Sequence, residues 1–182
     1  MRKVFAFATL ALAGCASAPP APPAPPAPRS TAQSAVANLA SASGSLVSGR
    51  VTLRAMDDGV HLGGTVGGLM PNSVHAIHVH EKGDCSAVDA TSAGGHFNPA
   101  GQAHGRASAP VHHAGDMDNI TAGAQGTAAL DIHLRGVTIG GNAPNDIAGR
   151  ALVVHAADDD YTSQPAGNAG ARVACAVIRV QQ

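Results

Sequence analysis

Six of the ten histidines in this 182-residue chain fall within a segment of 39 residues that ends at Asp116. They are His78, His80, His96, His104, His112 and His113. Neutral imidazole is the commonest side-chain ligand of copper and zinc, and a carboxylate can complete a zinc site. The segment therefore predicts a metal centre, and the remainder of the domain is expected to hold that centre in place.

One set of ligands suits copper. His78 and His80 lie two residues apart in an expected strand, so their side chains share a face and can reach the same ion. His155, at the end of a later expected strand, supplies a third imidazole. His75 is three residues before His78 and therefore points to the other face, where we expect it to form structural hydrogen bonds. His61 and His133 also lie on presumed strands without matching partners, and structural or surface roles are expected for them.

A second set suits zinc. His96, His104, His113 and Asp116 together offer three nitrogen atoms and one oxygen atom, a closed set that tetrahedral zinc prefers. His96 can belong to both sets, because an imidazolate offers one ring nitrogen to each of two ions. The sequence therefore permits a pair of metal ions joined through His96.

The elements that would position these side chains are strands. Alternating apolar and polar residues between turn signals predict strands within 44–57, 60–66, 74–80, 126–135, 149–155 and 171–180. The first two are expected to form a hairpin that turns at Asp58-Gly59. Residues 85–119 and 158–170 show no periodicity, and loops of such length are usually functional. The absence of a helical repeat predicts an all-β antiparallel sandwich or flattened barrel.

The first 44 residues are expected to precede the domain, which spans residues 45–182. Residues 1–14 have a positive start and a short apolar run, which predict a signal peptide. Leu12-Ala13-Gly14-Cys15 resembles the bacterial lipobox, so Cys15 is expected to carry lipid; the alternative is ordinary secretory cleavage, with Cys15 discarded or left as a free thiol. Residues 15–44 form an Ala/Pro-rich linker, semi-rigid up to residue 28 and in part helical over residues 30–44.

Net charge and cysteine content further restrict the class of protein and the compartment in which it works. Removing Arg2 and Lys3 with residues 1–14 leaves nine basic and twelve acidic residues, a net charge of −3. This net charge argues against a nucleic-acid-binding surface, which would need a basic patch. With Cys15 lipidated, Cys85 and Cys175 remain to pair in an oxidising compartment, the alternative being two unrelated buried thiols.

Five ordered motifs resemble the signatures of bacterial copper/zinc superoxide dismutases, over the chain from Ser45 to its C-terminus. They are His-Val-His-Glu-Lys-Gly-Asp-Cys at 78–85, Gly-Gly-His-Phe-Asn-Pro at 94–99, His-Ala-Gly-Asp at 113–116, Leu-Val-Val-His at 152–155 and Gly-Asn-Ala-Gly-Ala-Arg-Val-Ala-Cys at 167–175. The resemblance implies an eight-stranded Greek-key barrel or sandwich, immunoglobulin-like, with two long functional loops.

The resemblance also implies one copper ion and one zinc ion, with a role for each matched residue. Copper would be bound by His78, His80, His96 and His155, and zinc by His96, His104, His113 and Asp116. The His-Ala-Gly-Asp register selects His113, leaving the neighbouring His112 exposed to solvent or as an accessory ligand. Asp159 aligns with the carboxylate that orients a histidine of each ion, with the adjacent Asp158 as the alternative.

Three further residues take roles from the same resemblance. Cys85 and Cys175 would form the family's disulfide, which anchors the metal loop to the last strand. Arg172 would stand beside copper and hold the superoxide anion by charge-assisted hydrogen bonds. The second loop contains no lysine to steer an anion, so the rate is expected to be lower than in members that have one.

The implied function is the dismutation of superoxide to oxygen and hydrogen peroxide, by alternate reduction and reoxidation of a copper ion bridged to zinc through His96. The expected location is the bacterial envelope or periplasm, with Cys15 anchoring a monomer or homodimer to a membrane, the outer one favoured. The alternative function is that of a non-catalytic copper- and zinc-binding envelope lipoprotein. A structural surface antigen is a weaker alternative, since it would not need seven matching ligands.

Overall fold

The computed structural model describes residues 28–181. The expected signal peptide, Cys15 and residues 16–27 of the Ala/Pro-rich linker lie outside this range. Within it, nearly all regular structure is β-strand, and no helix is long and apolar enough to cross a membrane. The elements are β1 (Ser34–Ser41), β2 (Ser48–Met56), β3 (Gly59–Gly67), β4 (Val74–His75), β5 (Ile77–His80), a short 3₁₀ helix (Thr91–Ala93), β6 (Ile120–Thr121), β7 (Ala128–Arg135), β8 (Ala151–His155), β9 (Arg172–Val177) and β10 (Arg179–Val180).

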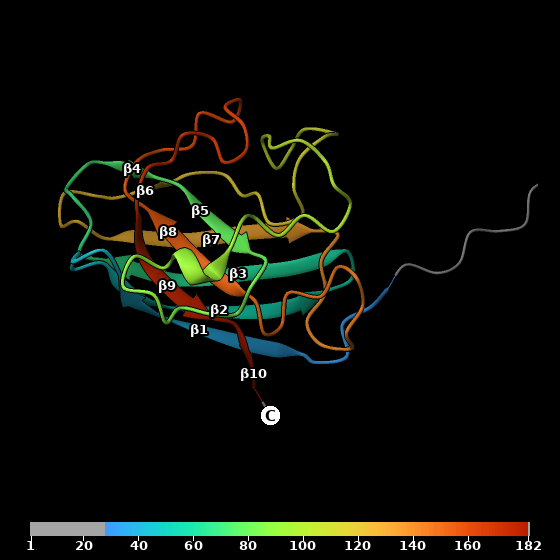
Figure 1. Ribbon diagram of the computed structural model, residues 1–182. Coiled ribbons are helices and arrows are strands. Elements are labelled where there is room, and N and C mark those ends of the chain that lie inside the picture. Colours follow the sequence, from blue (N-terminus) through green and yellow to red (C-terminus); the bar gives the residue numbers. More distant parts are fainter. Residues whose placement is uncertain (1–27, 182) are drawn as a thin grey trace, which may run out of the picture.

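Among residues 28–181, eight strands form one curled antiparallel sheet in the order β5-β8-β9-β1-β2-β3-β7, with β10 paired to β1, while β4 and β6 form a separate two-stranded sheet. After the β1-β2-β3 meander the chain crosses to β5 at the far edge, and β7 then returns beside β3. Strands β8 and β9 fill the space between β5 and β1. The expected antiparallel all-β fold is therefore confirmed, and the curled sheet is a half-barrel (Figure 1).

The core is built from small and branched apolar side chains. Along β2, the buried Val51 and Leu53 alternate with exposed polar residues, as a strand with one face on the core requires. Strand β8 is buried along its whole length, because it lies between β5 and β9 and beneath the long loops. These strands form a rigid support for the side chains at their ends.

The expectation for residues 30–44 was wrong. Strand β1, at Ser34–Ser41, lies inside the sheet, between β2 and β9, so the folded unit begins before Ser45. Its inward residues are Ala35, Ala37 and Leu39, all buried. Alanine and serine have little preference for strands, and the alternation of small residues therefore did not reveal the strand.

Two smaller boundaries also differ from the expected ones. Met56 pairs with Gly59, so the hairpin turns at Asp57-Asp58, one residue earlier than predicted. The expected strand over residues 74–80 is divided at Ala76 into β4, which pairs with β6, and β5, which pairs with β8. His75 and His78 therefore belong to different sheets.

The two long loops connect β5 to β6 and β8 to β9. Both lie on the same side of the sheet, above β5 and β8 (Figure 1). Residues far apart in the sequence meet between them, and this is where the predicted metal ligands gather.

Candidate metal centre

The structure brings His78, His80, His96 and His155 together. One ring nitrogen from each lies within 4.8 Å of those from the other three, and all four residues are buried. His78 and His80 come from β5, and His155 ends β8, where the pairing with β9 is irregular. His96 is drawn in from the first loop by an isolated antiparallel bridge to His80.

Hydrogen bonds fix the tautomers of three of these rings. The Nδ1 atom of His80 lies 2.9 Å from the Gly94 carbonyl, and that of His155 lies 3.4 Å from the Gly170 carbonyl. A carbonyl only accepts, so each Nδ1 carries the proton and each Nε2 presents a lone pair. These two Nε2 atoms lie 3.3 Å apart. His78 donates its Nε2 proton to Asp159, which leaves its buried Nδ1 without a hydrogen-bond partner.

The second group is His96, His104, His113 and Asp116, also buried and with ligand atoms within 4.8 Å of one another. The Oδ1 atom of Asp116 lies 2.8, 3.0 and 3.3 Å from the Nδ1 atoms of His96, His104 and His113. Its Oδ2 atom accepts hydrogen bonds from the backbone N–H groups of Gly105 and His113. One carboxylate oxygen is therefore anchored to the loop, and the other faces three imidazoles.

His96 lies between the two groups. Its Nδ1 atom is 3.3 Å from that of His113, on the side of Asp116. Its Nε2 atom is buried and has no hydrogen-bond partner in the described part of the chain, and its ring centroid lies 4.1 Å from that of His78. Each nitrogen of this ring thus faces one group, as a bridging imidazolate requires.

Three buried ring nitrogens of the two groups have no hydrogen-bond partner among the described residues: His78 Nδ1, His96 Nε2 and His104 Nδ1. Unpartnered buried polar atoms are rare, and a cation at the focus of each group would satisfy them. Four imidazole nitrogens suit copper, and three nitrogens with one carboxylate oxygen suit tetrahedral zinc. Both donor sets therefore fit the metals that the sequence predicts.

Asp159 connects the two groups. Its Oδ2 atom accepts a hydrogen bond of 2.9 Å from His78, and its Oδ1 atom one of 2.9 Å from His104. The side chain is buried, with the residue 2% exposed, whereas Asp158 is exposed to solvent. The structure thus places Asp159, and not its neighbour, where a carboxylate can orient one histidine of each group.

Burial keeps the rings neutral. Desolvation lowers the pKa of His78 to about 4, of His80 to about 2 and of His155 to about 3, and it also lowers the pKa of His113. Metal ligation needs neutral imidazole. Burial alone would raise the pKa values of Asp116 and Asp159, but hydrogen bonds to these carboxylates outweigh it and hold both values below the usual range.

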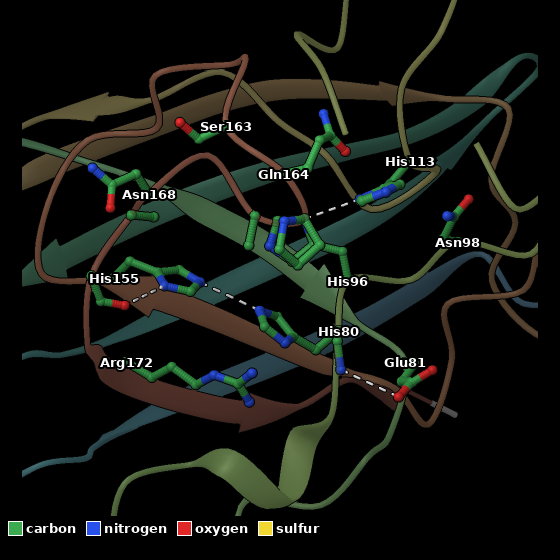
Figure 2. A pocket seen from close by; sticks show the side chains of 15 residues that line it. His80, Glu81, His96, Asn98, His113, His155, Ser163, Gln164, Asn168 and Arg172 are labelled. Atoms are coloured by element: carbon green, nitrogen blue, oxygen red, sulfur yellow. Dashed lines mark hydrogen bonds between the residues drawn. The ribbon is translucent and has the colours of Figure 1, made fainter. Parts of the chain in front are cut away.

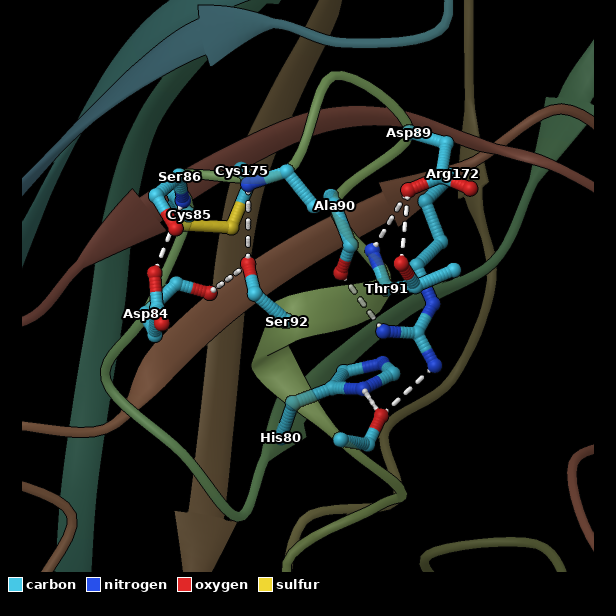
Figure 3. The surroundings of a disulfide bond; sticks show 12 residues. His80, Asp84, Cys85, Ser86, Asp89, Ala90, Thr91, Ser92, Arg172 and Cys175 are labelled. Atoms are coloured by element: carbon cyan, nitrogen blue, oxygen red, sulfur yellow. Dashed lines mark hydrogen bonds between the residues drawn. A yellow bond between two sulfur atoms is a disulfide. The ribbon is translucent and has the colours of Figure 1, made fainter.

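Arg172 lines the mouth of the centre. It lies at the start of β9, and its guanidinium donates hydrogen bonds of 2.7 and 2.6 Å to the carbonyls of Ala90 and Gly94 (Figure 3). The Gly94 carbonyl also accepts the Nδ1 proton of His80. One main-chain oxygen thus joins this cation to a ring of the copper-suited group.

An open cavity of about 680 Å³ lies above these residues. His80, His96, His155 and Arg172 line one side (Figure 2), and Ser163, Gln164 and Asn168 of the second loop line the other. The cavity gives a small anion access to the copper-suited group, with a positive charge beside it.

The predicted disulfide between Cys85 and Cys175 is present, with an S–S distance of 2.03 Å and a sequence separation of 90 residues. It joins the first loop to β9, three residues after Arg172 (Figure 3). The loop carbonyls that hold the guanidinium are therefore linked to the strand that carries it.

The other histidines lie outside both groups. His75 donates its Nδ1 proton to the His155 carbonyl, a structural role beneath a ligand-bearing strand end. His61 and His133 pair in register on β3 and β7 and lie near the carboxylates of Asp131 and Asp58. His112 contacts the carbonyl of the adjacent His113.

Three contributors to the site were missed in the sequence. The carbonyls of Ala90 and Gly94 act through the main chain, which no motif reveals. Asn119 forms a two-point contact with the backbone of Asp159, donating from Nδ2 to its carbonyl and accepting at Oδ1 from its N–H. An asparagine in a polar loop gives no separate signal, although its place three residues after Asp116 could have drawn attention.

Comparison with known proteins agrees with this geometry. A family model described as copper/zinc superoxide dismutase matches residues 47–178. Superoxide dismutase (Cu-Zn) 2 of Aquifex aeolicus (strain VF5) is 40% identical over 146 residues, which span 79% of this chain and 85% of the relative. The extracellular superoxide dismutase (Cu-Zn) of Brugia pahangi is 39% identical over 156 residues, spanning 81% and 76%.

Solved structures agree as well. The crystal structure of a double mutant of a SOD-like protein from Bacillus subtilis superposes with a TM-score of 0.71 at 33% sequence identity. The match covers 79% of this chain and 96% of that one. The similarity therefore extends over most of this chain.

Proposed function

Because the chain belongs to the copper/zinc superoxide dismutase family, it dismutates superoxide with copper and zinc as cofactors, and we propose which of its residues carry the reaction. Copper would be held by His78, His80, His96 and His155, and zinc by His96, His104, His113 and Asp116. The observation that supports this assignment is His96, whose two ring nitrogens face different ligand groups.

The bound copper ion would supply a one-electron couple that takes an electron from one superoxide and returns it to a second. The overall reaction consumes two superoxide anions and two protons and yields one dioxygen and one hydrogen peroxide. The protein residues attract the superoxide anion, position it and supply a proton.

Arg172 attracts and places the anion. Two of its N–H groups are held by the carbonyls of Ala90 and Gly94, so the guanidinium is fixed before substrate arrives. A preorganised cation at the cavity wall raises the rate of encounter with an anion and donates charge-assisted hydrogen bonds to its oxygen.

His96 supplies one of the two protons. Its Nε2 atom faces the copper-suited group and has no hydrogen-bond partner among residues 28–181. This nitrogen can hold a proton whenever it is not acting as a ligand, and can pass it to the reduced dioxygen, with water giving the second proton. Asp159 accepts hydrogen bonds from the rings of His78 and His104 and so fixes their orientation.

We also propose an extracytoplasmic location. The disulfide requires an oxidising compartment, and the Brugia pahangi relative is named as extracellular. On the sequence, we propose residues 1–14 as a signal peptide and Cys15 as the lipid-bearing residue of an outer-membrane lipoprotein. Replacement Cys15→Ser should move the protein from the membrane fraction to the soluble fraction.

Elemental analysis together with a superoxide-consumption assay tests the catalytic assignment. One copper and one zinc per chain are expected in the wild type, with consumption far faster than by the same concentration of free copper. His96→Ala should lose most of that rate, while His112→Ala, outside both groups, should keep it. A metal-loaded wild type no faster than free copper would favour the non-catalytic metal-binding lipoprotein.

A further inference from the structure

Gln164 forms a two-point contact between the two long loops. Its Oε1 atom accepts the His104 backbone N–H at 2.9 Å, and its Nε2 atom donates to the His104 carbonyl at 2.9 Å. The residues are 60 positions apart in the sequence. The carboxamide thus pairs with the main chain of His104 as a neighbouring strand would.

The same loop also holds the ring of His104. Asp159 accepts its Nε2 proton, and the Nδ1 atom then faces Asp116. The second loop therefore fixes this residue at three points, twice through the backbone and once through the ring. A shift of the His104 backbone would move a nitrogen atom of the zinc-suited group.

The loop that carries Gln164 is closed by its own hydrogen bonds. Gly167 donates to the Ser163 carbonyl, and the Asp160 carboxylate accepts the N–H groups of Thr162 and Ser163. Among the described residues, hydrogen bonds from 162–170 to the first loop come from the Gln164 side chain alone. This compact turn is one wall of the cavity (Figure 2), and Gln164 attaches it to His104 through the two hydrogen bonds described above.

We propose that Gln164 is a positioning residue, which fixes His104 for zinc and sets the place of the substrate-cavity wall in the same contact. The inference rests on the proposed assignment of His104 as a zinc ligand. The contact couples zinc binding to the position of the second loop. Its loss should therefore weaken zinc binding and increase the mobility of the cavity wall at the same time. Because Gln164 acts through the main chain of a ligand, its effect should resemble that of a lost outer-sphere partner, which costs about tenfold to hundredfold in metal affinity.

The test compares Gln164→Leu with Gln164→Glu in the full metal-loaded chain. Leucine fills similar volume without hydrogen bonds, whereas glutamate keeps the acceptor for the His104 N–H and loses the donor to its carbonyl. The matched control is Gln102→Leu, an exposed glutamine of the first loop with no hydrogen bond from its side chain.

Zinc release to a chromogenic chelator should be about tenfold or more faster in Gln164→Leu, intermediate in Gln164→Glu and unchanged in Gln102→Leu. The visible absorption of Co²⁺ loaded in place of zinc should shift in the same order. Hydrogen exchange should accelerate at the His104 amide and at Gly167 in Gln164→Leu, while Gln164→Glu keeps His104 protected.

Zinc release and exchange in Gln164→Leu equal to those in Gln102→Leu would overturn the proposal. If the leucine variant does not fold, Gln164→Glu decides alone, and a release rate equal to that of the wild type overturns it. Failure of the proposed function is distinguishable, because a wild type that binds no zinc would show it before any variant is compared.

Discussion

The Nε2 atoms of His80 and His155 face each other across 3.3 Å, although each ring already directs its Nδ1 proton to a main-chain carbonyl. Two lone pairs at this distance repel unless a cation lies between them. The folded strands thus hold two nitrogen lone pairs facing each other, and burial of the two rings disfavours their protonation.

The metal-free protein should lose stability in mild acid. Burial lowers the pKa of His78 to about 4, of His80 to about 2 and of His155 to about 3, all below the value near 6.5 of the unfolded chain. The unfolded state therefore binds more protons, so the stability contributed by the neutral rings is fully present above pH 6.5 and is lost as pH falls towards 4. Three groups at about 1.4 kcal/mol per pH unit each give at most about 4 kcal/mol per unit.

Urea denaturation of the metal-free protein at steps between pH 7.5 and pH 4.5 measures this slope. A triple variant with His78, His80 and His155 replaced by asparagine is the control, and its slope should be much smaller. A free energy of unfolding that is flat between pH 6.5 and pH 4.5 in the wild type would contradict the burial argument.

Arg172→Ala should reduce the second-order rate of superoxide consumption by about tenfold or more at low salt, because the fixed positive charge at the cavity wall is lost. Arg172→Lys should lie between, since lysine keeps the charge but not the planar fork that reaches both carbonyls. The wild-type rate should fall with ionic strength more steeply than that of Arg172→Ala. Equal salt dependence in these two proteins would argue against Arg172 as the attracting group.

Asp159→Asn should weaken retention of both metals by about tenfold to hundredfold, because an amide cannot accept from His78 and His104 at once. Competition with a chelator, followed by elemental analysis, gives the ratio. Asp158→Asn provides the matched control one residue away, with its side chain in solvent. Comparable metal loss in the two variants would contradict the bridging role of Asp159.

A chain that starts at Ser45 should not give a stable folded protein, whereas one that starts at Ser30 should. The shorter chain lacks β1, which leaves β2 and β9 with unpaired edges inside the sheet. Circular dichroism melting curves distinguish the two. Within the full domain, Leu39→Ala should cost about 2–5 kcal/mol through the cavity it leaves, and a melting temperature unchanged from the wild type would contradict its core position.

Much of the site could be predicted from the sequence, because residue type and spacing determine it. The shared face of His78 and His80 follows from strand geometry, and the His-Ala-Gly-Asp motif selects His113. What could not be predicted depends on contacts between distant segments. The Gly94 carbonyl that accepts a hydrogen bond from Arg172 belongs to the main chain, and Gln164 contacts His104 only once both loops are folded.

The fold shows the same division. Strongly alternating strands such as β2 and β7 could be predicted, since Val, Leu and Ile mark the inward positions. Strand β1 could not, because its inward positions are mostly alanine and its neighbours are serine and asparagine. Asp158 and Asp159 are chemically identical, and only the path of the loop decides which of them is buried.

The position of β1 has a mechanical consequence. The chain enters the domain directly into a strand flanked by β2 on one side and by β9 and β10 on the other. A pull from the N-terminal side is therefore borne in shear by many hydrogen bonds together, instead of unzipping them one at a time. If the N-terminus were attached to a surface, the domain would therefore resist unfolding by force at the point where the N-terminal segment enters β1.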